Sequence, residues 1–327
     1  MFEDIISLHN LCAAWEEFVR GKKQKNDVAE FSLRLGENLS TLHEDLRSRI
    51  YRHGGYKAFN ISDPKPRSIH KAMVRDRVLH HAIYRILYPY FDQKFIAASY
   101  SCRNQKGTHR GLNHFERYTR QVSRNNTRTC WVLKCDIKKF FASIDQEVLL
   151  TILHHDLKDR DVLWLLERII ESFETSPGRG LPLGNLTSQL LVNVYMNRFD
   201  QFVKHTLRIK YYLRYADDFV FLSENEVFLE ELTSIIKEFL ERELKLSLHP
   251  DKVSIKTWTS GIDFLGWVSF PDHRVLRTTT KRRMLKRVHD GHTENTIVSY
   301  LGMLQHGNAK KLKRLLEEIA RTGGRPL

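Results

Sequence analysis

The stretch YYLRYADDFVFL occupies residues 211–222 and places two adjacent acids, Asp217 and Asp218, between two apolar arms. Each arm is rich in aromatic and β-branched side chains, which favour strands. Two such arms around a short polar centre predict a β-hairpin with Asp217 and Asp218 at its turn. An Asp-Asp pair in a turn usually does no more than stabilise that turn. Here, however, two like charges meet at the end of apolar strands, and a bound cation would relieve their repulsion.

A third acid extends this pattern. The run WVLKCDI at residues 131–137 has strand length, and Asp136 lies at its end. One acid at a strand end and two in a hairpin turn suit phosphoryl transfer by two Mg²⁺ ions, which lie about 3.5–4 Å apart and share carboxylate oxygens. We therefore expect Asp136, Asp217 and Asp218 to form one catalytic metal centre.

Periodicity and turn signals predict a mixed α/β chain. We expect two N-terminal helices, the second over residues 29–51, and then a strand pair over residues 56–69. The spacing of Ser143 and Gln146 suits a capping box and predicts a helix start there. The run IDFLGWVSF at residues 262–270 predicts one strand. Further helices are expected over residues 75–91, 162–173 and 228–244, from Asn185 or Thr187 onward, and in most of the tail.

The charge of the chain indicates a polyanionic partner. Its 327 residues include 53 Lys and Arg against 39 Asp and Glu, and residues 273–327 alone hold 13 basic and 4 acidic residues. Such an excess points to nucleic acid or to an acidic membrane surface. No apolar run approaches the roughly 20 residues that cross a bilayer. The N-terminus also lacks the basic start and cleavage site of a secretory signal, so we expect a cytoplasmic location.

The cysteines exclude two classes of small domain. Cys12, Cys102, Cys130 and Cys135 form no C-x-x-C pair and no paired Cys/His spacing. This pattern argues against a zinc module and against a disulfide framework. We expect four buried, reduced thiols.

The acids lie in motifs that resemble those of the reverse transcriptases. YADD at residues 215–218 resembles the family's Y-x-D-D box, and DIKKFF at residues 136–141 resembles its first palm motif, in which an aromatic residue follows the acid by five positions. Three further motifs come in family order: PKPR at 64–67 with VRDRVLHHAI resembles the fingers motifs, LHPDK at 248–252 the motif behind the active site, and IDFLGW at 262–267 the primer-grip hairpin. The resemblance covers about residues 55–270.

This resemblance implies an α/β (α+β) fold of the right-hand polymerase type, with fingers, a palm built on an antiparallel sheet, and a short helical thumb. It implies RNA-directed DNA polymerase activity, in which a primer 3′-hydroxyl attacks a deoxynucleoside triphosphate. Two Mg²⁺ ions are the implied cofactor, with Mn²⁺ as an alternative. The implied domains are an N-terminal helical extension (1–54), fingers (55–130 with 145–183), palm (131–270 without that insert) and a basic helical thumb (271–327).

One segment makes the resemblance more specific, to a subfamily of these enzymes. It is LPLGNLTSQLLVNVYMNRFD at residues 181–200. Leu183 precedes Gly184 where the general family has Gln, and an aliphatic residue before G-N-x-x-S-Q resembles the diversity-generating retroelement enzymes. SYLGMLQHGNAKKL at residues 299–312 resembles their short thumb. This subfamily implies error-prone synthesis opposite template adenine. It also implies structured template RNA, an RNA/cDNA duplex and a small basic accessory protein, a helical-bundle oligomer, as partners.

Two alternatives stay open. The first is a defence-associated or group II intron-like reverse transcriptase. The second is a catalytically dead polymerase fold that serves as an RNA-binding scaffold, which the complete set of three acids disfavours.

The resemblance also implies roles for residues in the fingers and near Asp136. Lys65 and Arg67 would hold the incoming triphosphate, although a solvated basic turn is the alternative. Ile137 would lie beside Asp136 in the metal and nucleotide sites. Phe141 would lie under the deoxyribose and exclude a 2′-hydroxyl. The alternative is a plain core residue, but consecutive residues of an extended segment cannot both face one core.

The remaining candidates lie later in the chain. Leu183, Ser188 and Gln189 would line the nucleotide pocket, although Ser188 and Gln189 also suit a helix start. Lys252 would protonate the leaving pyrophosphate, or it is a surface charge. The thumb residues that we expect on duplex phosphates are Lys281, Arg282 and Lys286.

Overall fold

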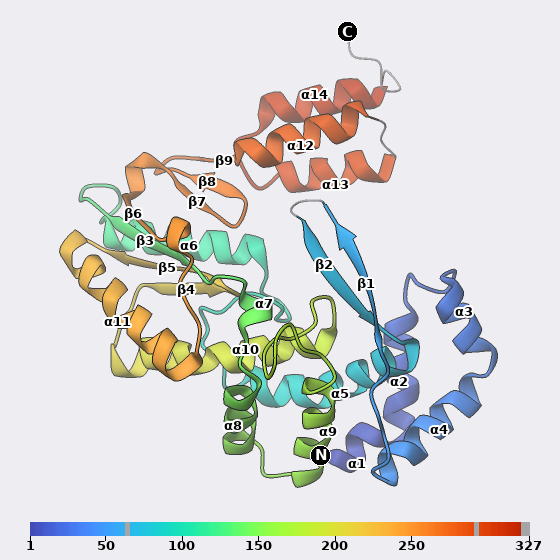
Figure 1. Ribbon diagram of the computed structural model, residues 1–327. Coiled ribbons are helices and arrows are strands. Elements are labelled where there is room, and N and C mark those ends of the chain that lie inside the picture. The colour runs from blue at the N-terminus through green and yellow to red at the C-terminus, as the bar shows by residue number, and fades with distance from the viewer. Residues whose placement is uncertain (63–65, 291–293, 322–327) are drawn as a thin grey trace. The chain divides into compact units, whose positions relative to one another are not determined.

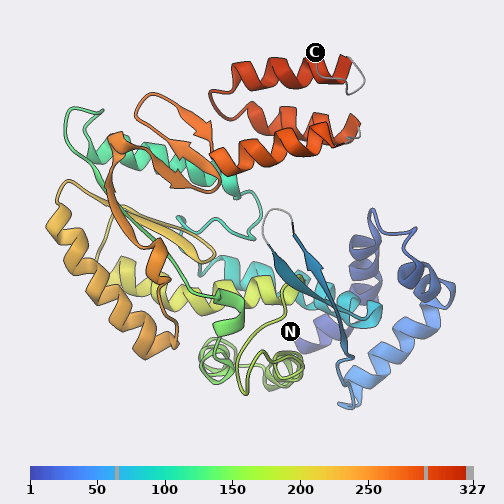
Figure 2. The ribbon, with the colours of Figure 1, turned by 45° about the horizontal axis from the view of Figure 1, so that its top comes forward.

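The computed structural model describes residues 1–62, 66–290 and 294–321, and Figures 1 and 2 trace its elements. The chain forms two compact units. Unit 1 comprises Met1–Arg103, Ile137–Ile209 and Ile236–His249, and unit 2 comprises Asn104–Asp136, Lys210–Ile235 and Pro250–Leu327. Each unit is thus assembled from three separate stretches of sequence. Within the described ranges, no helix combines the length and the apolar composition that a bilayer crossing needs.

Unit 1 is mainly helical and is organised around α5 (Val74–Asp92), which buries Val78, Leu79 and Ile83. The helices that contact α5 are α1 (Phe2–Ile6), α2 (Leu8–Val19), α3 (Asn26–Leu33), α4 (Leu35–Arg47) and α10 (Leu186–Gln201). The unit also contains α7 (Phe140–Ser143), α8 (Gln146–Asp156), α9 (Arg160–Ile170) and the C-terminal part of α11 (Glu226–Leu244). Strands β1 (Tyr56–Ile61) and β2 (Arg67–Ala72) form the predicted antiparallel hairpin.

The N-terminal segment holds four helices, so the prediction of two was wrong. Ser7 separates α1 from α2 because its side-chain oxygen accepts a hydrogen bond of 3.2 Å from a backbone N–H in the first turn of α2. Arg34 leaves helical geometry between α3 and α4, with φ −124° and ψ 40°. Another predicted cap also changes: Asp145, not Ser143, caps α8 through its side chain. Ser143 instead ends the short helix α7.

The segment before α10 lies directly against β2. The N–H of His70 donates to the Leu183 carbonyl at 3.0 Å, and the side-chain amide of Asn185 donates to the His70 carbonyl at 2.9 Å. Between them, Gly184 has φ +108°, and a Cβ at this position would lie only 2.8 Å from Ile69. Glycine therefore permits the close approach.

Unit 2 is built on an antiparallel sheet with the strand order β4-β5-β3-β6. Its strands are β3 (Trp131–Asp136), β4 (Tyr212–Tyr215), β5 (Asp218–Ser223) and β6 (Ser254–Thr257). Adjacent residues on one strand, such as Val132 and Leu133, are both fully buried, so both faces of the sheet are covered. Helix α6 (Thr108–Val122) contacts β4 and β5.

A smaller sheet and three helices complete unit 2. They are β7 (Ile262–Phe264), β8 (Trp267–Ser269), β9 (Arg274–Leu276), α12 (Thr278–His289), α13 (Glu294–Leu304) and α14 (Lys310–Arg321). Residues 262–270, predicted as one strand from their pattern but likened to a hairpin by the family resemblance, form the β7–β8 hairpin because Leu265 and Gly266, at φ 51° and 86°, turn the chain. The connection from α13 to α14 lies against this sheet, since a Cβ on Gly307 would collide with the Trp267 ring.

The four cysteines are free thiols. Cys130 and Cys135 are buried as expected, but Cys12 and Cys102 are exposed, so the prediction of four buried thiols was wrong for these two. Cys12 lies on a solvent-facing position of α2, and Cys102 lies in a turn with φ 53°.

Candidate active site

The three predicted acids meet at one end of the unit 2 sheet. Asp136 ends β3 and is the cross-strand partner of Asp218, the first residue of β5. Cβ atoms of such partners lie about 4.5–5.5 Å apart, so their carboxylates share one small space. Asp217 lies in the turn between β4 and β5. Asp218 is therefore a strand residue, and only Asp217 belongs to the turn itself.

A buried arginine supports this turn. Ala216 has φ +55°, a region that residues other than glycine rarely adopt. The guanidinium of Arg214, which is fully buried, donates to the Ala216 carbonyl at 3.1 Å. Strain of this kind persists only where the surroundings enforce it. Arg214 was absent from the sequence-based candidates, although a charge inside an apolar strand arm was a usable signal.

Burial and neighbouring acids make Asp218 difficult to ionise. Desolvation raises the pKa of Asp218 to about 7, Asp136 and Asp217 raise it as well, and Lys134 acts in the opposite direction. Among the described residues, Oδ1 of Asp218 is a buried acceptor without a hydrogen-bond partner. Its Oδ2 lies 3.7 Å from Nζ of Lys134. A further cation at this position would stabilise the ionised form.

Lysines of the chain itself lie against the acids. Nζ of Lys252 donates to Oδ1 of Asp136 at 2.8 Å. Nζ of Lys134 donates to the Asp263 carbonyl at 2.6 Å, and Nε of Arg277 donates to the Asp263 carboxylate at 2.7 Å. Within the described part of the chain, no three His, Cys, Asp or Glu side chains already converge as metal ligands. The unpartnered oxygen of Asp218 and the set of hard carboxylate donors nevertheless fit a divalent cation such as Mg²⁺.

Several other candidates lie in unit 1. Ile137 is buried, Phe140 is buried, and Phe141 is half-buried with its ring centroid 5.7 Å from that of Phe140. Arg67 is exposed at the start of β2, where it pairs with Ile61 across the hairpin. Lys65 lies outside the described residues.

The segment that begins α10 lines a hollow of unit 1. Gly184 and Gln189 contribute to this hollow of about 300 Å³, together with Phe59 and Ile69 of the β1–β2 hairpin. Leu183 is half-buried next to Gly184. Ser188 is almost fully buried, so only Gln189 of the two polar candidates lines the hollow.

The predicted thumb residues all lie on one helix. Lys281, Arg282 and Lys286 are exposed on α12, while Met284 and Val288 are buried on it. Arg282 and Lys286, four residues apart, lie on the side of α12 opposite Met284 and Val288, whereas Lys281 lies on the same side as Val288. Exposed basic side chains on a helix are suited to contacts with phosphates.

Known proteins share both the sequence pattern and the fold. The family model described as reverse transcriptase (RNA-dependent DNA polymerase) matches residues 61–269. Protein YkfC of Escherichia coli is 24% identical over 288 residues, which cover 76% of this chain and 74% of YkfC. The group II intron-encoded protein LtrA of Lactococcus lactis is 21% identical over 290 residues, 67% of this chain and 47% of LtrA. The chain thus spans less than half of that intron-encoded relative.

A solved structure extends the likeness to the fold. The telomerase of Candida albicans, in complex with a fragment of telomeric RNA, aligns with a TM-score of 0.53 and 12% identity over 78% of this chain and 51% of that one. This likeness confirms the α/β class and the polymerase fold. Because the family model matches more than half of the sequence, the chain belongs to the reverse transcriptase family and carries its RNA-dependent DNA polymerase domain.

Proposed function

We propose that the chain copies a structured template RNA into cDNA by two-metal nucleotidyl transfer, and that it does so with low fidelity in a diversity-generating retroelement. The observation that carries the chemistry is the pairing of Asp136 with Asp218 across the sheet, with Asp217 in the adjoining turn. In this proposal, residues 55–130 with 145–183 serve as fingers, the rest of 131–270 as palm and 271–327 as thumb.

The acids and the lysines of the cluster have different roles in the proposed nucleotidyl transfer. Asp136, Asp217 and Asp218 would hold two Mg²⁺ ions, which when bound activate the primer 3′-hydroxyl and stabilise the charge on the leaving group. Lys252, now 2.8 Å from Asp136, would leave this carboxylate and donate a proton to the departing pyrophosphate. Lys134 stays bonded to the Asp263 carbonyl and keeps positive charge beside Asp218.

The remaining candidate residues would hold the nucleotide. Arg67 and Lys65 would bind its triphosphate, and the half-buried Phe141 would pack on its sugar. Leu183 offers apolar contact but has no side-chain donor or acceptor, whereas a Gln there could hydrogen-bond near the base or sugar. Losing such a bond lowers discrimination by about tenfold to a hundredfold, which supports the proposal of an error-prone enzyme.

A group II intron-like function is the second candidate, because LtrA is among the similar proteins. The error rate of DNA synthesis distinguishes the retroelement function from the intron-like function. We would supply purified protein with an RNA template, a DNA primer, labelled dNTPs and Mg²⁺, with Asp217→Asn as the inactive control. Sequencing the cDNA should show errors concentrated at template adenines, and fewer of them in Leu183→Gln. A low error rate that does not depend on the template base would overturn the retroelement assignment and favour the intron-like one.

A further inference from the structure

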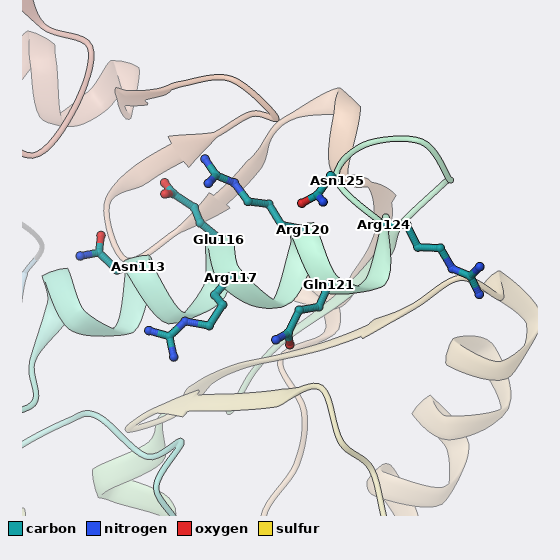
Figure 3. A pocket seen from close by; sticks show the side chains of 7 residues that line it. All are labelled: Asn113, Glu116, Arg117, Arg120, Gln121, Arg124 and Asn125. Atoms are coloured by element: carbon teal, nitrogen blue, oxygen red, sulfur yellow. The ribbon is translucent and has the colours of Figure 1, made fainter.

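Two adjoining hollows follow helix α6 in unit 2. The first measures about 550 Å³ and is lined entirely by α6 and the turn after it, including Arg117, Arg120 and Arg124 (Figure 3). The second measures about 440 Å³ and shares Arg120 with the first. It continues along the β8–β9 turn to Arg274 and to Lys310 at the start of α14. We call this surface, with its five basic residues, the α6 groove.

The basic residues of the α6 groove are incompletely neutralised. Arg274 lies 3.4 Å from Glu116, and Arg124 lies 3.6 Å from Glu224. Among the residues that the structure describes, no ion pair is found for the exposed Arg117, Arg120 or Lys310. Figure 3 shows Arg117 and Arg120 projecting to different sides of α6. Both arginines are exposed, so a ligand on this face of α6 can reach them.

The start of α14 adds a second indication of an anionic ligand. Its first turn contains Lys310, Lys311 and Lys313 and no acidic residue. The positive end of the helix dipole makes cations unfavourable there and anions favourable. A phosphate beside Lys310 would compensate both the helix end and the lysines.

Aromatic and amide groups make the groove more than a patch of charge. Phe270 and His273 stack with their ring centroids 4.9 Å apart, and both line the second hollow. Trp258, only 2% exposed, lines the same hollow, and its indole Nε1 is a buried donor without a partner in the described structure. Asn113 and Asn308 contribute amides to the two hollows. Aromatic faces and amides suit unpaired bases and sugar hydroxyls, in addition to phosphates.

The groove reaches the end of the sheet opposite the acids. Arg124 and Arg128 both lie near Glu224, which directly follows β5, whereas Asp218 begins that strand. Six residues of strand separate the two ends, which corresponds to about 17–20 Å. This end of the groove therefore serves something other than the reacting nucleotide.

We propose that the α6 groove binds a single-stranded segment of RNA outside the polymerase active site. This inference rests on the proposed function, since a template RNA is the polynucleotide that the enzyme must hold. Arginines and Lys310 contact the backbone, the Phe270–His273 pair stacks on a base, and the amides contact bases and 2′-hydroxyl groups.

The test is a binding measurement on the full chain. Its probe is a fluorescein-labelled RNA hairpin with an unpaired tail, and its variants are Arg117→Glu with Arg120→Glu, and Phe270→Ala. We expect the double variant to weaken binding about tenfold or more and to lower the slope of log K against log salt by about one to two units. Phe270→Ala should weaken binding of the tailed hairpin but not of a blunt RNA duplex, because only the tail offers unpaired bases. The matched control is Lys23→Glu with Lys25→Glu, two exposed lysines of unit 1 that carry the same change of charge.

Three outcomes would overturn the proposal. They are an unchanged salt slope in the double variant, an equal loss of RNA binding in the lysine control, and binding of the same sequence as DNA that is equally tight and equally weakened by the variants.

If the melting curve shows that the double variant does not fold, photocrosslinking of a 4-thiouridine tail to the unmodified protein replaces it. Crosslinks within residues 113–125, 270–274 or 307–310, or at Trp258, support the groove, and crosslinks elsewhere overturn it. DNA synthesis on a short primed template is measured separately, so failure of the polymerase proposal and failure of the groove remain distinguishable.

Discussion

The acid cluster and the α6 groove handle charge in opposite ways. In the cluster, Arg214 is buried and Asp218 is half-buried, and the neighbouring carboxylates and lysines lie within a few ångströms of one another. Along the groove, Arg117 and Arg120 are exposed and belong to no ion pair of the described structure. A buried charge is costly to leave without its partner, whereas one exposed charge contributes little alone. We therefore expect single substitutions to disable the cluster, and groups of substitutions to be needed elsewhere.

The largest effect should come from Asp218→Asn. Polymerisation should fall about a thousandfold or more, because a negatively charged ligand for the metals is lost. The melting temperature should stay equal or rise, since an amide replaces a carboxylate whose burial is unfavourable. Labelled dNTP incorporation and thermal melting measure the two effects, with the exposed Glu241→Gln as control. Near-normal synthesis by Asp218→Asn would show that Asp218 is not a ligand of the catalytic metals.

Arg214→Met tests the buried cation behind the turn. Removing the donor to the Ala216 carbonyl should lower the free energy of unfolding by about 1–3 kcal/mol. Polymerisation should also fall, though less than in Asp218→Asn, because Ala216 can relax from its positive φ and move Asp217. The exposed Arg20→Met should change stability by no more than about 0.5 kcal/mol. Lower stability with unchanged activity would limit Arg214 to a structural role.

Phe140 and Phe141 are neighbours that differ in burial, so their alanine variants can be compared directly. Phe140→Ala should cost about 3–5 kcal/mol of stability, because that ring is buried. Phe141→Ala should cost less and should admit ribonucleotides, since the half-buried ring is the proposed barrier to a 2′-hydroxyl. Competition between rNTPs and dNTPs, together with urea unfolding, measures both. An unchanged sugar preference in Phe141→Ala would exclude this role.

Charge reversal on α12 should have a smaller, graded effect. Changing Lys281, Arg282 and Lys286 to Glu should weaken binding of an RNA/DNA duplex and lower its salt slope by about two to three units, if each contacts a phosphate. The control reverses the exposed Arg20, Lys23 and Lys25 of unit 1. Variants in the α6 groove should instead affect RNA with unpaired bases most. Identical effects of both sets on both ligands would show that the two surfaces are not distinct.

The smallest expected effect concerns pH. His109 stacks on His306 with ring centroids 3.5 Å apart, and burial, His306 and Arg274 lower the pKa of His109 below its usual 6.5. Because the folded state binds the proton less readily than the unfolded state, this contribution to stability is present above pH 6.5 and is lost as pH falls through the lower folded value. Melting temperatures between about pH 8 and about pH 5 should therefore decline less in His109→Phe. Equal declines would assign the pH dependence to other groups.

The acid cluster could be predicted from sequence because local pattern determines it. Asp136 ends β3, Asp218 begins β5, and Asp217 lies in the two-residue turn directly before β5, which leaves the adjacent acids little freedom. The errors at the N-terminus arose where a single cap, such as Ser7, divides a helix without changing the apolar period. The antiparallel sheet was implied by the family resemblance, whereas the strand order that brings Asp136 beside Asp218 was not predicted from the sequence.

The α6 groove and the burial of Arg214 could not be predicted in the same way. The groove combines α6, the β8–β9 turn and the start of α14, which are far apart in the chain. The sequence of each of these three segments alone predicts only an ordinary solvated basic surface. Arg214 is buried because neighbouring elements cover its strand, and this covering depends on tertiary packing.

The close approach of Gly184 to β2 has an evolutionary consequence. His70 is bonded through both its N–H and its carbonyl to the segment that carries Leu183, and β2 also carries Arg67. Residues joined in this way rarely change independently, and paired substitutions show epistasis. Sequence drift at Leu183 should therefore be accompanied by compensating change in the hairpin. A directed-evolution library that seeks altered fidelity should randomise both segments together and leave Gly184 constant, because a Cβ there would meet Ile69.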